Sequence, residues 1–338
     1  MTTSPSPTPS PGDLPEGFPS GMVTAEPALV TKALAEVSAI GPYFEISSDA
    51  GREDEPLWRP LRELSRDTEA LRARITDYRR RLGVREDRVA ASILFQGLAA
   101  RMWSPVVGTV SAYGLLPATV SEHLLWRPVP TGPLPLWAPP STMRWLVLPS
   151  LATGAAPETS PAPAPGTGPA PASEASPAFG PGIGLTLAPG TGAAPAGAAG
   201  IIGGPGTGNG QVAELVYRTV VTEMLEPLAE AFRSVSKIAS GLLWGNAGSA
   251  LAGILRTLPQ ARPDLAPRAA RLVGDVLRLG VLAGTGRLAE PAPGTHLFVR
   301  SSCCLYYRVQ PGGYCDDCAL IPTADRAAQW ARLTGGPL

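Results

Sequence analysis

The chain has 338 residues, with 28 basic and 28 acidic side chains and a formal net charge of zero. This balance creates no overall field that would attract nucleic acid or an anionic membrane, so we expect no nucleic-acid partner. The length suits one large domain or two smaller ones, although the 38 glycines and 39 prolines crowd into stretches that we do not expect to fold.

The N-terminus predicts a tail outside the folded part. Residues 1–25 are rich in Ser and Pro, and they lack the charged and apolar regions of a secretory signal. We therefore expect a disordered tail on a protein that is not exported. The longest apolar stretch, residues 89–120, is interrupted by Gln96, Arg101 and Pro105, so it fails as a membrane span. These features favour a cytoplasmic protein.

Residues 26–150 form the first part of the predicted folded domain. Apolar residues at three- and four-residue spacing predict an amphipathic helix over 66–82, which Gly83 ends. A second, almost fully buried helix is predicted to begin at Asp87 and reach Met102. From 124 to 148, tryptophans alternate with prolines, a pattern that favours short strands with proline-bounded turns.

Residues 151–210 consist almost entirely of Ala, Pro, Gly, Ser and Thr. Such a composition cannot bury enough apolar surface to offset the entropy of ordering, so we predict a disordered insertion. Residues 211–291 return to helical spacing, with Pro227 expected to kink one helix. Residues 292–338 form a C-terminal module that a short strand, 295–299, introduces. The predicted fold is helix-rich α+β with a small antiparallel sheet and an irregular C-terminal cysteine module.

All four cysteines lie within this module, in the pattern Cys-Cys-x10-Cys-x2-Cys. They are Cys303, Cys304, Cys315 and Cys318. Thiols this close together predict one metal–sulfur site, since disulfides would need an oxidising compartment. The last pair has the spacing of a zinc knuckle but the adjacent first pair does not. A [2Fe-2S] cluster also takes four thiolates, two per iron. The spacing alone leaves both zinc and iron–sulfur open.

The residues around the cysteines resemble the C-terminal [2Fe-2S] motif of FhuF-like ferric-siderophore reductases. The spacing of all four ligands agrees, as do the flanking segments 302–308 and Gly312-Gly313. Two further segments, 95–105 and 243–246, are similar to the body of that family. The 151–210 insertion departs from the family pattern and places the continuity of the domain in question.

The resemblance implies that Cys303, Cys304, Cys315 and Cys318 bind a [2Fe-2S] cluster. It implies a cytoplasmic protein that reduces siderophore-bound Fe3+ to Fe2+ by one-electron transfer and so releases iron. No nucleotide fingerprint is visible, so electrons would come from an external donor, a ferredoxin or a flavin reductase. A peripheral position at the inner face of the membrane, beside a siderophore permease, is compatible with this function.

Two alternatives remain beside this interpretation. The first is a binding or adaptor protein that a zinc ion on four cysteines stabilises. The second is an iron–sulfur redox sensor involved in siderophore handling. Neither alternative reduces a substrate.

Several residues are candidates for supporting a cluster or a substrate, each with a plainer structural role as its alternative. Amides of Gly312 and Gly313 would donate to sulfur, or else form an ordinary turn. Arg308, and less so Arg300, would offset negative charge, or else lie solvated at the surface. The aromatic and amide candidates would shield the cluster or line a substrate cleft, or else pack in the core. They are Tyr306, Tyr307, Tyr314, Trp244 and Asn246.

Overall fold

The computed structural model describes residues 22–50, 55, 57–118, 120–129, 132–148 and 207–334. Most of the predicted tail and insertion therefore lies outside the described residues, and their disorder stays a prediction. The predicted end of the tail, at residue 25, and the predicted end of the insertion, at residue 210, were both placed a few residues too late. Strand β1 (Val23–Thr24) begins before residue 25, and helix α6 (Thr207–Tyr217) begins before residue 210.

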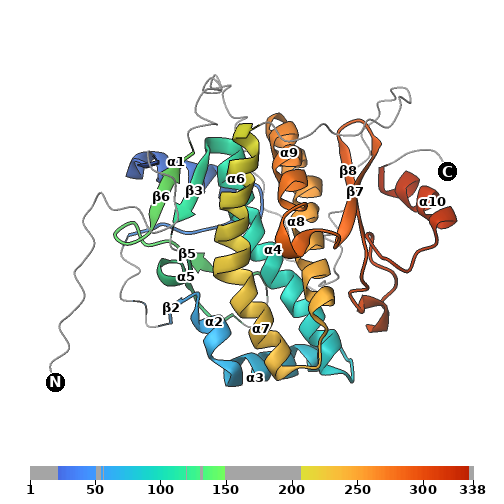
Figure 1. Cartoon of the computed structure of the whole chain (residues 1–338). Helices are drawn as coiled ribbons and strands as arrows, with labels where there is room; N and C mark the ends of the chain where they lie inside the picture. Colours follow the sequence, from blue (N-terminus) through green and yellow to red (C-terminus); the bar gives the residue numbers. More distant parts are fainter. Residues whose placement is uncertain are drawn as a thin grey trace, which may run out of the picture.

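Helix α4 (Asp87–Tyr113) runs through the centre of the molecule and packs along α8 (Ser240–Ala261) (Figure 1). It is apolar on nearly every side, which is typical of a helix that is buried all round. It ends at Gly114, whose φ of 62° is the left-handed conformation that favours glycine. The predicted end at Met102 was wrong because the helix continues through Pro105. Core packing on both sides outweighs the roughly 3 kcal/mol cost of an internal proline.

Helices from the first part of the chain pack against α4, with α3 (Thr68–Arg81) and α1 (Pro27–Ser38) toward its opposite ends (Figure 1). Helix α3 confirms the amphipathic helix predicted over 66–82. The Asp67 side chain caps it by accepting a hydrogen bond of 2.9 Å from the Ala70 amide. The shorter neighbours were not predicted. They are α1, α2 (Glu63–Arg66) and α5 (Val120–His123).

The strands form three small antiparallel sheets within the described residues. One has the order β1-β6-β3, from Val23–Thr24, Arg144–Val147 and Leu115–Ala118. A second has the order β2-β4-β5, from Arg59–Pro60, Leu125–Trp126 and Leu136–Trp137. The third pairs β7 (Gly286–Ala292) with β8 (Thr295–Arg300). The α+β fold class and the short strands between 124 and 148 are confirmed.

The second half of the chain supplies the helices that complete the core. Helix α6 leads into a π-helical stretch η2 (Arg218–Leu225), then α7 (Glu226–Val235), α8 and α9 (Ala266–Val276). The π-helical stretch lies directly before Pro227, where a kink was predicted. Proline cannot donate to the carbonyl one turn earlier, and a widened turn accommodates this. The short 3-10 turns are η3 (Pro263–Leu265), η4 (Gly280–Leu282) and η5 (Tyr306–Arg308).

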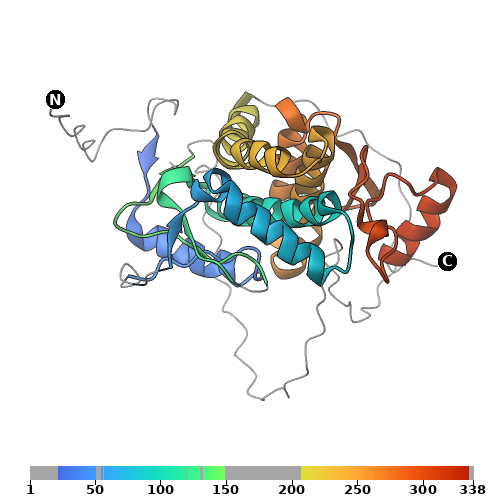
Figure 2. The same ribbon diagram turned by 90° about the horizontal axis from the view of Figure 1, so that it is seen from below.

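Apolar residues from both halves, 22–148 and 212–282, form one continuous core. Figures 1 and 2 show the helices in the middle, with the two three-stranded sheets at one side. The β7–β8 hairpin, the cysteine segment and α10 (Thr323–Thr334) lie at the opposite side. None of the helices in the described part of the chain has the length and apolar character to cross a bilayer.

Candidate metal centre

The four cysteines lie in the irregular segment that connects β8 to α10. Cys304, Cys315 and Cys318 are buried and form a small cluster with Tyr306 and Ile321, separate from the main core. The Sγ atoms of Cys304 and Cys315 are 3.4 Å apart. Cys303 is partly exposed. The structure thus brings together thiols from the two ends of this segment of the chain.

Backbone amides donate to two of the sulfur atoms. The Leu305 amide lies 3.3 Å from Sγ of Cys303, and the Leu320 amide lies 3.4 Å from Sγ of Cys318. Such bonds favour a thiolate over a thiol, and a thiolate is the form that binds metal. Leu305 has a φ of 69°, a strained conformation for a residue other than glycine. The loop is held in this shape where it presents its amide to sulfur.

The thiols differ in how readily they ionise. A hydrogen bond from Cys315 and the positive charge of Arg300 outweigh burial and lower the pKa of Cys304 to about 7. The same hydrogen bond, together with burial, raises the pKa of Cys315, which therefore holds the shared proton. Burial also raises the pKa of Cys303. Without a metal, the pair favours one thiolate and one thiol.

These donors have the chemistry that a [2Fe-2S] cluster requires, namely four thiols in one loop with amides directed at sulfur. Among the described residues, no three His, Cys, Asp or Glu side chains are arranged to hold a single metal ion. A [2Fe-2S] cluster does not need such a group, because each of its irons takes only two protein thiolates.

Arg300 is buried beside the thiols, with 2% of its surface exposed. Its Nε lies 3.0 Å from Oδ2 of Asp317, and its Nη1 lies 2.6 Å from Oδ1 of Asn246. Burial acts to lower the pKa of Arg300, but the charges of Asp317 and of the neighbouring thiols outweigh burial and raise it. A fixed positive charge therefore lies within the field of the cysteines.

A polar network extends from this ion pair into the two central helices. The Asn246 amide donates to the carbonyl of Ser92 at 2.8 Å, and the Ser92 hydroxyl donates to the carbonyl of Cys304 at 2.6 Å. Ser249 donates to Asp317 and accepts from Gln96 at 3.4 Å. The network joins α4, α8 and the cysteine segment through buried groups, which fixes the segment against the helices.

Two glycines on α8 let neighbouring parts of the chain approach closely, the cysteine segment at Gly245 and the residue before β7 at Gly248. A Cβ at Gly245 would lie 2.1 Å from Oγ of Ser302, the residue before Cys303. A Cβ at Gly248 would lie 2.6 Å from Oγ1 of Thr285. Only glycine fits at these contacts without a shift of the neighbouring chain.

Helix α10 holds the other end of the segment. The buried Arg326 donates to the carbonyls of Cys318 and Ile321, at 2.7 and 3.0 Å. Gln329 donates to the carbonyl of Asp316 at 2.9 Å. These bonds satisfy backbone carbonyls that the irregular segment leaves without a ladder partner.

The structure gives two of the predicted supporting residues, Gly312 and Arg308, their plainer structural roles. The Gly312 amide donates to the carbonyl of Val309 in a turn and is not directed at sulfur. The amides of Leu305 and Leu320 do lie within hydrogen-bonding distance of sulfur. Arg308 lies at the surface, paired with Glu86 and 3.1 Å from the Tyr307 hydroxyl. Arg300, the less favoured arginine, is the buried one.

The remaining candidates divide between core and surface. Tyr306 is half-buried and packs on Val89, Ile93 and Val309, whereas Tyr307 and Tyr314 are exposed. The other three candidates are Gly313, which is exposed, Trp244, which is half-buried against the main core, and Asn246, which is fully buried in the polar network.

Sequence reasoning missed Asp317, Gln96 and Ser249 as parts of the site. Asp317 stands between Cys315 and Cys318, and this position was a usable signal because an acidic side chain there must lie close to the thiols. Ser249 carried no signal, since its role depends on how α8 packs against the loop.

Comparison with known families agrees with this geometry. Residues 300–320, from the buried Arg300 through all four cysteines, match the family model described as FhuF 2Fe-2S C-terminal domain. No curated protein matches the chain. The cofactor of this domain is a [2Fe-2S] cluster. Residues 300–320, near the C-terminus, are therefore a cysteine motif of the FhuF 2Fe-2S type.

Proposed function

We propose that this protein reduces siderophore-bound Fe3+ to Fe2+ with a [2Fe-2S] cluster held by Cys303, Cys304, Cys315 and Cys318. The observation that carries the proposal is the buried cysteine segment inside a domain of the FhuF 2Fe-2S type. The resemblance of segments 95–105 and 243–246 to the same family supports it, because both contribute to the polar network around the thiols.

The chemistry is one-electron transfer. The bound cluster supplies a single electron at low potential. The substrate Fe3+ accepts this electron and becomes Fe2+, and no bond to carbon forms or breaks. Hard oxygen ligands hold Fe2+ much less tightly than Fe3+, so the iron then dissociates to other ligands.

The residues of this chain have three tasks in that reaction. Burial of Cys304, Cys315 and Cys318 excludes water from most of the centre. The charge of Arg300 offsets the negative charge that the added electron brings. Cys303 is partly exposed and so provides the route by which an external donor, a ferredoxin or a flavin reductase, would deliver electrons. We place this reaction in the cytoplasm, where a peripheral position beside a siderophore permease is compatible with it.

The direct test is oxidation of the reduced protein by substrate. The purified protein is reduced with dithionite under argon, freed of reductant and mixed with ferric siderophores of the hydroxamate and catecholate types. We expect the visible absorption of the oxidised cluster to return with at least one of them. If the reduced protein is stable to every ferric chelate, the reductase function is wrong and a sensor role is favoured.

The ligand set has its own test. The protein should contain about two iron and two sulfide per chain, and Cys315→Ser should lose the native visible spectrum. A colourless protein with one zinc ion would contradict the cluster, and a native spectrum in Cys315→Ser would contradict the ligand set. The visible spectrum of Cys303→Ser, altered at the partly exposed cysteine, is compared with that of Cys315→Ser, altered at a buried one.

A further inference from the structure

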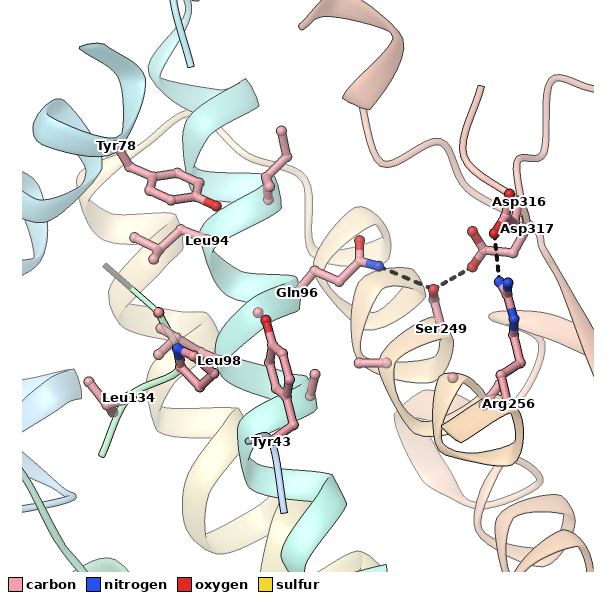
Figure 3. A pocket seen from close by; sticks show the side chains of 18 of the residues that line it. Tyr43, Tyr78, Leu94, Gln96, Leu98, Leu134, Ser249, Arg256, Asp316 and Asp317 are labelled. Atoms are coloured by element: carbon pink, nitrogen blue, oxygen red, sulfur yellow. Dashed lines mark hydrogen bonds and ion pairs between the residues drawn. The ribbon is translucent and has the colours of Figure 1, made fainter. Parts of the chain in front are cut away.

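A cavity of about 300 Å³ lies beside the cysteine segment. Helices α3 and α4 form one wall, and α8, β8 and the cysteine segment form the other. Figure 3 shows its two ends. Tyr43, Tyr78 and Leu94 lie on the side of α3 and α4, while Arg256 and Asp316 lie on the side of the cysteines. The end at α3 and α4 therefore combines aromatic and apolar side chains with the charged Arg74, Asp77 and Arg81, and the end at the cysteines is polar.

The polar end adjoins the metal centre. Asp316 and Asp317 line the cavity and are the two residues between Cys315 and Cys318. A molecule that touches this wall therefore contacts a residue that is adjacent in sequence to a candidate cluster ligand. Because electron transfer slows steeply with distance, an electron acceptor bound at this wall would be well placed to receive an electron.

The polar wall is held in place without a ligand. Arg256 Nη1 lies 2.6 Å from Oδ2 of Asp316, and Asp317 is paired with Arg300. Gln96 donates to Ser249 across the gap between α4 and α8, as the dashed lines in Figure 3 show. Side chains locked by such contacts make a preformed site, which lowers the entropy cost of binding.

The lining suits an organic iron chelate. Its volume is within the range of small-molecule sites, and its walls are mainly apolar with a few convergent polar groups. A siderophore complex has the same division, with carbon arms around a metal centre that oxygen atoms coordinate. Its arms would pack on Tyr43, Tyr78 and Leu94, and its metal would lie toward Asp316.

We infer that this cavity is the binding site for the ferric chelate, an assignment that rests on the proposed function. The inference concerns binding alone, so it is testable without any electron transfer. The probes are Ga3+ complexes of a tris-hydroxamate and of a tris-catecholate siderophore, since Ga3+ has the charge of Fe3+ but is not reduced under these conditions.

Two glycines in the lining of the cavity leave room for the first carbon of an added side chain. Gly97 on α4 and Gly253 on α8 both line it, and a Cβ at either position would meet no atom within 4 Å. The test variants are Gly97→Leu and Gly253→Leu. The matched control is Gly274→Leu on α9, which is outside the cavity and has only the end of Arg278 nearby, at 3.8 Å.

We expect the unaltered protein to bind at least one Ga3+ complex, measured by calorimetry. Each cavity variant should weaken that binding at least tenfold, whereas Gly274→Leu should bind normally. The visible spectrum of the cluster should be unchanged in all three variants, which shows that they fold. Two independent variants on different helices guard against a local folding defect in either one.

The inference is overturned if both cavity variants bind the Ga3+ complex as the unaltered protein does. It is also overturned if no Ga3+ complex binds while ferric chelates still oxidise the reduced protein, because the chelate then reacts elsewhere. Failure of the proposed function looks different, since ferric chelates would then leave the reduced protein unoxidised.

Discussion

Arg300 places a buried positive charge next to the thiols, and Asp317 balances it at 3.0 Å. If the charge offsets the electron on the cluster, the two residues have opposite effects on the reduction potential. Arg300→Gln should lower the potential because it leaves a net negative charge, and Asp317→Asn should raise it because it leaves a net positive one. A redox titration followed by visible absorption measures both. Shifts of the same sign in the two variants would contradict this electrostatic role.

The double variant separates charge from structure. Removing one partner of a buried ion pair costs about 3–5 kcal/mol, because the other charge is left unpaired. Arg300→Gln should therefore also lower the melting temperature. Combining it with Asp317→Asn removes both charges, so the potential should return toward that of the unaltered protein. Arg300→Lys retains the charge, so its reduction potential should stay close to that of the unaltered protein. Lysine nevertheless fits Asn246 less well than arginine does.

At this scale the sequence predicted the thiols better than their surroundings. Four cysteines in one short segment indicate a metal–sulfur site by their number and spacing. The choice between Arg300 and Arg308 depends on which side of the loop faces α8, and no local pattern encodes that orientation. Only the packed structure shows that Arg300 is buried and that Arg308 pairs with Glu86 at the surface.

At the scale of elements, Gly245 of α8 sets the distance between the helix and the cysteine segment. Gly245→Ala adds a methyl group 2.1 Å from Oγ of Ser302. Although alanine favours a helix over glycine by about 1 kcal/mol, we expect a lower cluster content, measured as iron per chain. Gly241→Ala is the control, since a Cβ there meets nothing within 4 Å.

A second substitution tests whether the contact itself is responsible. Ser302→Ala removes the oxygen that the new methyl group would meet, so Gly245→Ala combined with Ser302→Ala should recover cluster content. A full cluster content in Gly245→Ala alone would show that the segment has room to move. The close approach of α8 would then have no role in holding the centre.

The elements themselves were predictable where their pattern is periodic and local. The spacing of apolar residues predicted α3 correctly, and the prolines and tryptophans predicted short strands. Strand β7 was missed because Pro291 interrupts it at a register shift, and only pairing with β8 stabilises it. Helix α10 has no long apolar run, and its position depends on the bonds that Arg326 makes to the loop.

At the scale of the whole molecule, the cysteine cluster is separate from the main hydrophobic core. The core contains residues from both halves of the chain and does not depend on a metal. Removal of the cluster with a chelator and a reductant should therefore leave most of the helical circular dichroism signal in place. Tryptic cleavage near Arg308 should become faster, since the segment loses its internal support. Loss of most of the helical signal would contradict this independence.

The two halves meet along α4 and α8, and the polar network that reaches the thiols starts from the same two helices (Figure 1). The similarity of segments 95–105 and 243–246 to one family gave a partial indication that these two helices pack together. The hydrogen bond from Asn246 to Ser92, which lies just before the first segment and 154 residues away in the chain, could not be read from either segment alone.

The central claim is that one electron leaves this centre for one ferric ion in a chelate. The most direct test counts both in one anaerobic cuvette, with a defined amount of reduced protein, excess ferric siderophore and a coloured Fe2+ chelator. We predict that one Fe2+ appears for each cluster that is re-oxidised, and that Cys315→Ser produces none. Re-oxidation of the protein without any Fe2+, or Fe2+ formation at the same rate in Cys315→Ser, would contradict the claim.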